Sequence, residues 1–511
     1  MKKGYLLGID IGTYESKGVL VRLDGSLAAS AVKPHDLLIP QQGWAEHDPE
    51  KTWWGDFVLL TQSLINQSQI DPSKIAGIGV SAIAPCMLPV DKKGNPLRMG
   101  ILYGVDTRAH IEIGELNERF GKEYLLSKTG NELSSQAVGP KILWLKKNEP
   151  ENYKKAAKFV TASTFIITRL TGRTVIDHLT ASFFLPLYDF HNGCWSEEFC
   201  NGIVEQERLP ELGWASETAG KVTAEAALIT GLAEGTPVTF GTADASAEAV
   251  SVGVVKPGQM MLMYGSTIFM YLVTSQPKVD ERLWAARYLF PGTSAFAAGM
   301  ATSGSLTRWF RDKLSLDLLN VEKAGGENAY TALVREASGI SAGSEGLVVL
   351  PYFSGERTPI NDPKARGMFF GLTLAHQRGH LYRAILEGMG YGVRQHFDVM
   401  REIEVMPDDV IAVGGGTKNP LWLQIISDIS GMPQKVPEVT FGASYGDAFL
   451  AGMAVGAYSS YDQINSWLQF DRTIQPDKSK YELYDKYYRV YLDLYQRNKG
   501  LMADLHSLAN F

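Results

Sequence analysis

The chain has 511 residues, of which 45% are hydrophobic and 21% charged, a composition typical of a globular protein with a large core. At about 100–200 residues per domain, this length predicts about two to four domains. The net charge of −7 and the absence of a long basic run argue against nucleic acid as a partner. Three cysteines without a CxxC pair exclude a disulfide framework, disfavour a structural zinc site, and fit a reducing cytoplasmic compartment.

Two apolar stretches need to be assigned before the fold is considered. At the amino terminus, Asp10 interrupts the apolar run of MKKGYLLGIDIG, so we expect no targeting segment. Residues 257–277 carry no charge and are long enough to suggest a membrane span. Because Gly265, Ser266 and Thr267 interrupt this stretch, it predicts two buried strands joined by a small polar turn, and no membrane association.

Strands and helices alternate in both halves of the chain, which predicts α/β architecture. The first half is expected to hold three strands within the first 32 residues, helices at 50–69, 108–127, 141–157 and 163–171, and a buried strand at 75–83. After an Ala-rich helix near 244–253, the second half is expected to hold strands at 348–353 and 410–416 and helices at 379–402, 420–430 and from Ser444. A Lys-Pro-Gly break separates the halves, so we predict domains at residues 1–252 and 253–511.

The first polar cluster follows the first strand, in the sequence Gly8-Ile-Asp-Ile-Gly-Thr-Tyr-Glu-Ser-Lys17. Gly12 would let an anion approach the backbone, and Thr13 and Lys17 offer a hydroxyl group and a positive charge. Asp10 is suited to hold a magnesium ion through water. The alternative is an ordinary hairpin with a capped turn.

A second small polar turn, Gly265-Ser-Thr267, lies between two strongly apolar strands. Buried polar groups need partners, and a second phosphate-binding loop would supply them. A plain hairpin turn is the alternative. Two such strand–turn–strand segments, one opening each half, are more informative together than either is alone.

Asp244 opens the Ala-rich helix in the sequence Gly241-Thr-Ala-Asp-Ala. Most aspartates in this position cap the helix. The functional alternative is a general base placed at the start of a helix beside a cleft between two domains.

Three glycines, Gly414 to Gly416, end a predicted strand just before Asn419 and Pro420. Pro420 suits the first turn of a helix. A tight strand-to-helix turn rarely needs three glycines, so we expect a ligand loop in which a flat ring lies against bare backbone and Asn419 forms a hydrogen bond to it.

Tyr103, Asp106 and Arg108 lie between a strand and a helix. An aromatic face for C–H groups and charged partners for hydroxyl groups suit a polyhydroxylated ligand. A helix cap with a surface ion pair explains the same residues equally well.

Together these segments resemble the FGGY family of carbohydrate kinases, part of the actin/hexokinase/Hsp70 superfamily. The most specific match is Gly367-Met-Phe-Phe-Gly-Leu372, followed after seven residues by His380-Leu-Tyr-Arg-Ala-Ile-Leu-Glu387. Ser354-Gly-Glu-Arg-Thr-Pro359 and Gly442-Ala-Ser-Tyr-Gly-Asp-Ala448 are similar to the xylulokinase branch. The resemblance extends from about Tyr5 to Tyr458.

This resemblance implies two ribonuclease-H-like α/β domains with ATP in the cleft between them. It implies Asp244 as catalytic base, also in contact with the sugar, and Asp10 as the magnesium residue. The residues that it implies for binding ATP are Gly12, Thr13, Lys17, Gly265, Thr267, Gly304, Arg308, Gly415 and Asn419. The candidate sugar contacts are Ser81, Ala84, Tyr103, Asp106 and Arg108.

Two segments depart from the family pattern. The N-terminal signature around Lys141 is partial, because Gln136 and Val138 are not the usual residues. The run from Ser81 to Cys86 holds no histidine or glutamine, whereas xylulokinases carry a sugar-contacting Gln-Met-His-Gly there. The second departure puts xylulose itself in question and leaves the kinase chemistry unchanged.

The sequence therefore predicts a cytoplasmic kinase that transfers the γ-phosphoryl group of MgATP to a small sugar, with D-xylulose as the leading substrate. Ribulose, erythritol or a glycerol-like polyol are the alternatives within this chemistry. An actin- or Hsp70-like ATPase, or a sugar-binding regulator without activity, are the alternatives outside it. The oligomeric state stays open, with a homodimer as one option.

Overall fold

The computed structural model describes residues 4–508 and divides into two compact units. Unit 1 holds the chain up to Pro257 together with Val273–Ala295 and Val439–Leu468. Unit 2 holds Gly258–Leu272, Phe296–Glu438 and the chain from Gln469 onward. The units thus interleave along the sequence, and the predicted split into residues 1–252 and 253–511 stays a prediction.

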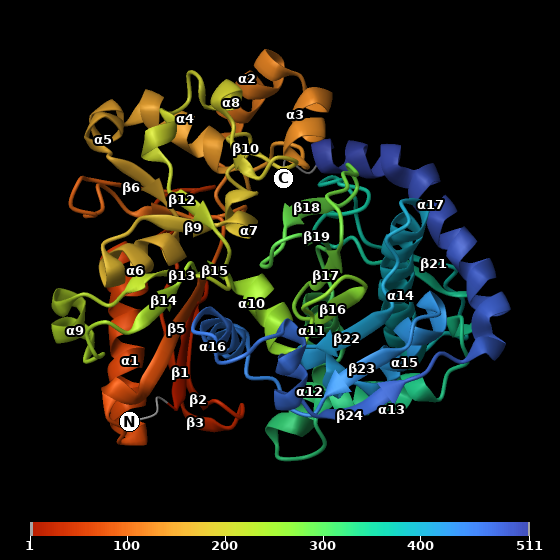
Figure 1. Cartoon of the computed structure of the whole chain (residues 1–511). Coiled ribbons are helices and arrows are strands. Elements are labelled where there is room, and N and C mark those ends of the chain that lie inside the picture. The colour runs from red at the N-terminus through yellow and green to blue at the C-terminus, as the bar shows by residue number, and fades with distance from the viewer. Residues whose placement is uncertain (1–3, 509–511) are drawn as a thin grey trace. The chain divides into compact units, whose positions relative to one another are not determined.

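Unit 1 is built on a sheet with the strand order β13-β14-β5-β1-β2-β3, and β15 also pairs with β5 (Figure 1). β1 runs antiparallel to β2, with Asp10 opposite Lys17, and parallel to β5, with Asp10 beside Ser81. The register therefore brings three polar residues together at one end of an otherwise apolar sheet. The strands are β1 (Tyr5–Ile11), β2 (Glu15–Arg22), β3 (Leu27–Pro34), β5 (Ile75–Ala82), β13 (Thr218–Lys221), β14 (Pro237–Thr239) and β15 (Thr242–Ala243).

Helices cover both faces of this sheet. α1 (Gly55–Ser68) and α6 (Ala162–Thr171) pack through one apolar cluster with the strands, while α16 (Ala443–Ala454) packs on β1 and β5 with α10 (Asp244–Ser251) against it. α16 lies so close that a Cβ at Gly8 or Gly79 would fall within 2.0 Å of its backbone oxygens. This close approach sets Asp447 of α16 beside the polar end of the sheet.

A second apolar cluster of unit 1 is enclosed by short elements between residues 86 and 213. Two helical segments that the sequence predicts as continuous are broken there, at Gly121, whose φ is +83°, and at Pro150, which lacks a backbone N–H group. The helices are α2 (His110–Phe120), α3 (Lys122–Thr129), α4 (Val138–Asn148), α5 (Pro150–Lys155), α7 (His178–Ala181) and α8 (Glu197–Cys200), with α9 (Ala224–Thr230) further on. The short strands of this unit are β4 (Glu46–His47), β6 (Leu88–Val90), β7 (Gly100–Ile101), β8 (Lys158–Val160), β9 (Val175–Asp177), β10 (Tyr188–Asp189), β11 (Cys194–Trp195) and β12 (Glu211–Gly213).

The second sheet, most of which lies in unit 2, has the order β18-β19-β17-β16-β22-β23-β24, where β18 is Trp284–Arg287. Its strands from β24 to β19 repeat the topology of the first sheet. β16 is antiparallel to β17 and parallel to β22, as β1 is to β2 and β5. The two strands predicted within residues 257–277 are confirmed as β16 and β17. The strands of unit 2 are β16 (Gln259–Tyr264), β17 (Ile268–Thr274), β19 (Ser294–Met300), β22 (Asp409–Val413), β23 (Gln434–Pro437) and β24 (Phe470–Ile474), with β20 (Val348–Leu350) and β21 (Met368–Phe370) paired separately.

The predicted helix at 379–402 is α14 (Arg378–Glu402), which is buried along most of its length and packs on α13, α15 and β20. Its buried Glu387 accepts hydrogen bonds from Gly343 N and Ser344 Oγ, at 2.9 and 2.8 Å, and pairs with Arg383. The most specific sequence motif therefore anchors α14 in the core. The other helices are α11 (Gly304–Leu314), α12 (Leu316–Lys323), α13 (Ala329–Ser338), α15 (Pro420–Ser430) and α17 (Tyr481–Leu508).

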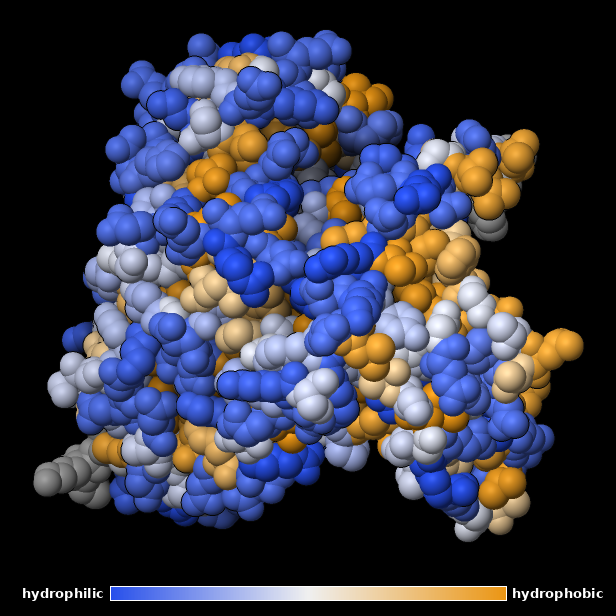
Figure 2. Space-filling model, turned by 90° about the vertical axis from the view of Figure 1, so that its right-hand side faces the viewer, coloured by the Kyte–Doolittle hydropathy of each residue, from blue (hydrophilic) through white to orange (hydrophobic). Residues whose placement is uncertain are grey.

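The surface on the side of α17 is mostly hydrophilic, with separate hydrophobic spots (Figure 2). Leu501, Leu505 and Leu508 of α17 are among the exposed apolar side chains. No helix within residues 4–508 is long and apolar enough to cross a bilayer. The two sheets of matching topology confirm the predicted two-domain α/β class.

Candidate functional site

The turn between β1 and β2, which we call the first turn, spans Gly12–Glu15. Gly12 N donates to Glu15 O at 3.0 Å, and a Cβ at Gly12 would lie 2.6 Å from that oxygen, so only glycine fits. Thr13 Oγ1 lies 3.1 Å from the hydroxyl of Tyr103, and Lys17 Nζ pairs with Glu15 at 2.8 Å. The first turn is therefore tight, and it presents a hydroxyl group and a half-exposed ammonium group.

Behind the first turn, Asp10 and Asp447 share the hydroxyl group of Ser81. Ser81 Oγ lies 3.0 Å from Asp10 Oδ1 and 2.7 Å from Asp447 Oδ2, and all three residues are buried. A hydroxyl group has one hydrogen and can donate only one of these two hydrogen bonds. The hydrogen of the second bond must therefore come from a protonated carboxyl group. Accordingly, burial holds the pKa of Asp10 well above its ordinary value, with a smaller contribution from Asp244, and burial and Asp10 do the same to Asp447.

Asp244 is the first residue of α10, and the N-cap position belongs to Ala243, whose side chain cannot cap a helix. Its Oδ1 accepts the Ala245 N–H at 2.7 Å, and burial raises the pKa of Asp244 to about 6. One helical turn later, burial raises the pKa of Glu248 to about 7, and Asp244 contributes to that rise. Asp244 is therefore not the helix cap of the simpler alternative, and it belongs to an acidic cluster with Asp10.

The turn between β16 and β17, which we call the second turn, spans Gly265–Thr267 and is held by the start of α11. Ser303 N and Ser305 N both donate to Ser266 O at 3.0 Å, and Gly304 N donates to Gly265 O at 3.0 Å. A Cβ at Gly304 would lie 2.5 Å from Gly265 O. Gly304 is therefore the residue that lets α11 approach the second turn.

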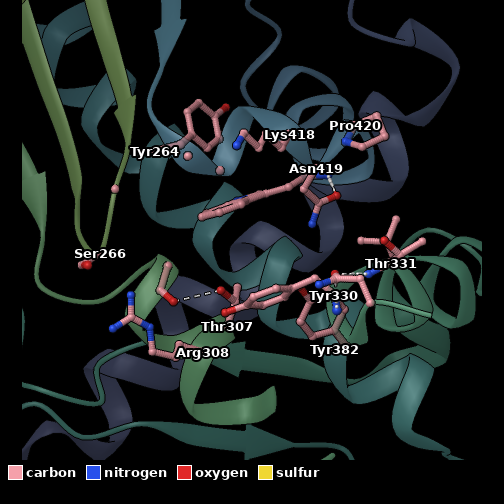
Figure 3. Close-up of a pocket in the computed structure, with 17 residues that line it drawn as sticks. Tyr264, Ser266, Thr307, Arg308, Tyr330, Thr331, Tyr382, Lys418, Asn419 and Pro420 are labelled. Atoms are coloured by element: carbon pink, nitrogen blue, oxygen red, sulfur yellow. Dashed lines mark hydrogen bonds between the residues drawn. The ribbon is translucent and has the colours of Figure 1, made fainter. Parts of the chain in front are cut away.

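A cavity of about 870 Å³ lies in unit 2 beside the second turn. Figure 3 shows Lys418, Asn419 and Pro420 on one side, Tyr330 and Tyr382 facing them, and Ser266 toward one end. Arg311 stacks on the Tyr330 ring at 4.8 Å, which fixes one aromatic wall. The lining residues are Tyr264, Gly265, Ser266, Gly304, Thr307, Arg308, Asn328, Tyr330, Thr331, Val334, Tyr382, Gly415, Gly416, Lys418, Asn419, Pro420 and Trp422.

The three glycines before α15 have three different environments. Gly414 has a φ of +92°, and a Cβ at Gly416 would lie 2.6 Å from the Trp422 ring. A Cβ at Gly415 would meet nothing within 4 Å, although Gly415 lines the cavity. Backbone shape and packing therefore account for the outer two glycines, and only the middle one leaves open space for a ligand. Asn419 caps α15 by accepting Trp422 N at 3.1 Å.

Asp106 and Arg108 are enclosed in their own ion pair. Arg108 Nε and Nη2 reach Asp106 Oδ2 at 3.0 and 2.7 Å, Nη2 also reaches Glu46 at 2.8 Å, and the guanidinium group lies 3.8 Å from the Trp44 ring. Both side chains have no exposed surface, so a direct sugar contact would require this pair to open.

Tyr103 differs from that ion pair, because it is only half-buried. Lys141, from the partial N-terminal signature, donates to the carbonyl oxygens of Leu102 and Tyr103 at 2.6 and 3.0 Å. Burial lowers the pKa of Lys141 to about 8. This lysine therefore holds the segment that presents Tyr103 beside the first turn.

The run from Ser81 to Cys86 offers little polar surface. The Ser81 hydroxyl group faces carboxyl groups, Ile83 is buried, and Cys86 Sγ donates to Ile83 O at 3.3 Å. Only Ala84 in this run is partly exposed. The segment that departs from the xylulokinase pattern is therefore an apolar wall.

Several polar residues around these turns carry no local sequence signal. His35, His47 and Asp56 surround the first turn, and Tyr330 and Tyr382 line the cavity. Glu248 is the exception, because the sequence places it four residues after Asp244 on the same predicted helix.

The chain is similar to known sugar kinases over most of its length. A xylulose kinase of Bacillus subtilis is 28% identical over 98% of this chain and 99% of its own length. A ribulokinase of Bacillus licheniformis is 28% identical over 88% of this chain and 87% of its own length. The crystal structure of a xylulose kinase from Rhodospirillum rubrum matches with a TM-score of 0.91 and 32% identity, covering 98% of this chain and 99% of that one.

The family models cover both halves of the chain. Residues 5–251 match the N-terminal domain of the FGGY family of carbohydrate kinases, and residues 260–455 match its C-terminal domain. These matches confirm the predicted family and set the actin- or Hsp70-like alternative aside. The chain therefore belongs to the FGGY family of carbohydrate kinases.

Proposed function

We propose that this enzyme transfers the γ-phosphoryl group of MgATP to a hydroxyl group of a small ketose, with D-xylulose as the leading substrate. The observation that carries the proposal is the acidic cluster of Asp10 and Asp244 beside the tight first turn, in a chain of this family. Full-length similarity to xylulose kinases supports the substrate, and similarity to a ribulokinase keeps ribulose as the nearest alternative.

Asp244 is the residue we propose as general base. With a pKa of about 6, its carboxyl group is mostly ionised at neutral pH and still basic enough to accept a proton from a sugar hydroxyl. Phosphoryl transfer depends mainly on positioning and charge stabilisation, so one well-placed base suffices. A contact between Asp244 and the reacting hydroxyl group of the sugar is part of the same proposal.

We assign the phosphates of ATP to the two turns. Gly12, Thr13 and Lys17 would supply a bare backbone, a hydroxyl group and a positive charge from the first turn. From the second turn, Gly265 and Thr267 would supply a bare backbone and a hydroxyl group, but no positive charge. This division explains why each turn is small, polar and closely held between apolar strands.

Magnesium fits the acidic cluster by its donor chemistry. Carboxylate oxygens are the ligands that Mg²⁺ prefers, and Asp447 Oδ1 is buried without a hydrogen-bond partner. Within residues 4–508, no three acidic, histidine or cysteine side chains form a ready-made cation site. Asp10 would therefore hold the ion together with water and phosphate oxygens, and the ion would neutralise phosphate charge.

We assign the nucleoside of ATP to the cavity of unit 2. Its volume suits a nucleotide, Gly415 leaves space for a flat ring, and Asn419 and Arg308 offer polar contacts at its edge. Gly304 contributes by bringing α11 against the second turn. The aromatic wall of Tyr330 and Tyr382 adds an apolar surface for the base.

For the sugar, we propose that Tyr103 and Ala84 make direct contact, and that Ser81, Asp106 and Arg108 act by holding their neighbours in place. The apolar run from Ser81 to Cys86 would reduce hydrogen bonding on one side of the sugar and relax specificity there. Erythritol and glycerol-like polyols are therefore alternatives to test beside the pentuloses. A homodimer stays a prediction, and three unpaired cysteines support a cytoplasmic location.

A coupled assay of ADP release over a panel of ketoses and polyols tests this function. We expect the highest kcat/KM for D-xylulose or another pentulose, and dependence on Mg²⁺. A strong preference for a polyol would replace the substrate, and ADP release that no sugar stimulates would reject the kinase proposal.

A further inference from the structure

Two histidines contact the backbone carbonyl oxygens of the first turn. His35 Nε2 lies 3.1 Å from Gly12 O, and His47 Nε2 lies 3.1 Å from Thr13 O. The rings meet edge to face, with their centroids 5.0 Å apart. Two adjacent carbonyls of one turn are thus bound at equal distances by two side chains of the same type.

His47 makes its contact as a neutral ring. Trp53 Nε1, which can only donate, lies 3.2 Å from His47 Nδ1, so Nδ1 accepts and the single ring proton sits on Nε2. Burial lowers the pKa of His47 to about 4, with a further contribution from His35. His47 therefore keeps the same tautomer, and the same bond to Thr13 O, throughout the neutral pH range.

His35 faces an acceptor at both ring nitrogens. Its Nδ1 lies 2.8 Å from Asp56 Oδ2, and its Nε2 faces the carbonyl oxygen of Gly12. Ser16 Oγ already donates to the same Asp56 oxygen at 2.8 Å, which marks that oxygen as an acceptor. A ring that donates at both nitrogens carries two protons.

The surroundings of His35 suit an imidazolium ion. Its side chain is 7% exposed and that of Asp56 is 3% exposed, so the pair is buried. Asp56 of α1 supplies the opposite charge, Ser16 of β2 lies 3.4 Å from Nδ1, and His47 of β4 contributes a neutral ring. Loss of the second proton would leave a lone pair facing either Asp56 or Gly12 O, and one of the two bonds would break.

We propose that His35 and His47 are positioning residues of the first turn, and that His35 holds it only as an imidazolium ion whereas His47 holds it as a neutral ring. The proposal rests on the proposed function in one respect, namely that the first turn binds phosphate. Its consequence is a phosphate site whose shape depends on one buried proton. ATP affinity then depends on the bond between His35 Nε2 and Gly12 O.

The protonation states can be measured without any enzymatic activity. In full-length protein labelled with ¹⁵N-histidine, the side-chain spectrum at neutral pH should show His35 protonated at both nitrogens and His47 at Nε2 only. His35→Gln and His47→Gln assign the two signals by their loss. A singly protonated His35 at neutral pH would overturn the proposal.

Binding of MgATP to the same three proteins, measured by calorimetry at pH 7, tests the consequence. His35→Gln should bind about 10-fold more weakly than wild type, the size expected for the loss of one charge-assisted hydrogen bond. His47→Gln should bind about 3-fold more weakly, because the hydrogen bond that it loses is neutral.

A His35→Gln variant that bound MgATP as tightly as wild type would reject the role of His35. If both variants bound MgATP more weakly as expected but wild type phosphorylated no sugar, the proposed function would fail while this inference stood.

Discussion

The first and second turns have the same topology, but they are held in place by different groups. Side chains from three other elements, His35, His47 and Tyr103, hold the first turn. Backbone N–H groups of Ser303, Gly304 and Ser305 hold the second turn, and the Ser305 hydroxyl group adds one bond to Ser266 O at 2.8 Å. The first turn therefore depends on side chains that can carry a charge, whereas the second depends mainly on a close approach of backbone to backbone.

This difference indicates which part of the enzyme should respond to a change in pH. Backbone amides do not titrate near neutral pH, so the second turn should bind phosphate equally well at any pH at which the protein is folded. The first turn lies beside the acidic cluster of Asp10, Asp244 and Asp447, whose pKa values are all raised. Control of the reaction by pH is thus expected from unit 1, and the binding of the nucleoside from unit 2.

The largest effect should come from the base that lies near the first turn. Asp244→Asn keeps the size of the side chain but removes the ability to accept a proton, so kcat should fall by about 10²–10⁴-fold. Affinity for ATP should change by less than about 2-fold, because we place no nucleotide contact on Asp244.

Glu248→Gln is the matched control for Asp244→Asn, one turn further along α10. It removes a neighbouring carboxyl group whose pKa is also raised. If Glu248→Gln lost as much activity as Asp244→Asn, general loss of charge would explain the result, and Asp244 would lose its special role.

Gly415→Val should separate the nucleoside site of unit 2 from the chemistry of unit 1. The new side chain would enter open space in the cavity, where nothing lies within 4 Å of an added Cβ. Competition between the new side chain and the nucleotide base of ATP should weaken ATP binding by about 30-fold, equivalent to about 2 kcal/mol. Calorimetry with sugar alone should show wild-type affinity.

Gly416→Ala provides the contrast to Gly415→Val. A Cβ at this position meets the Trp422 ring at 2.6 Å, so the expected result is a lower melting temperature. Loss of sugar binding in Gly415→Val would mean that the substitution unfolds unit 2 and does not report on the cavity.

Gly304→Ala tests the backbone contact of the second turn. The added Cβ would lie 2.5 Å from Gly265 O, which forces α11 away from the turn. We expect KM for ATP to rise by about 10-fold, with the pH dependence of kcat unchanged. A changed pH dependence of kcat would contradict the proposed division between the two turns.

The pKa of Asp244 predicts the acidic limb of the rate profile. A base must be ionised to act, so kcat should rise with pH through about 6 and be about 10-fold lower at pH 5 than at pH 7. Initial rates at saturating sugar and ATP measure this. A kcat that stayed constant down to pH 4.5 would exclude Asp244 as the group that limits the rate.

Local patterns in the sequence predicted both turns, the strands around them and the glycine loop before α15. Each of these depends on residues that are neighbours in the chain. Partners that come from distant segments could not be predicted in this way. Asp447 lies 366 residues from Ser81, and no spacing rule relates Tyr330 to Gly415.

The same limit applies to the predicted sugar contacts. Asp106 and Arg108 have the residue types that suit a polyhydroxylated ligand. Whether they face a ligand depends on Glu46 and Trp44, which approach from a separate strand and loop and enclose the pair. Residue type alone therefore cannot distinguish a contact residue from a positioning one, because the packing around the pair decides which role is open to it.

The smallest effect should come from the hydroxyl group of Tyr103, which contacts a side chain of the first turn and not its backbone. Tyr103→Phe removes the hydrogen bond to Thr13 Oγ1, which spans 3.1 Å, but it keeps the aromatic ring. A neutral hydrogen bond contributes about 1 kcal/mol, so KM for ATP should rise by at most about 5-fold. KM for the sugar should stay constant if the ring face makes the sugar contact, and Tyr103→Ala should then raise it. If Tyr103→Phe raised KM for the sugar instead, the hydroxyl group would belong to the sugar site, and the first turn would be held by its two histidines alone.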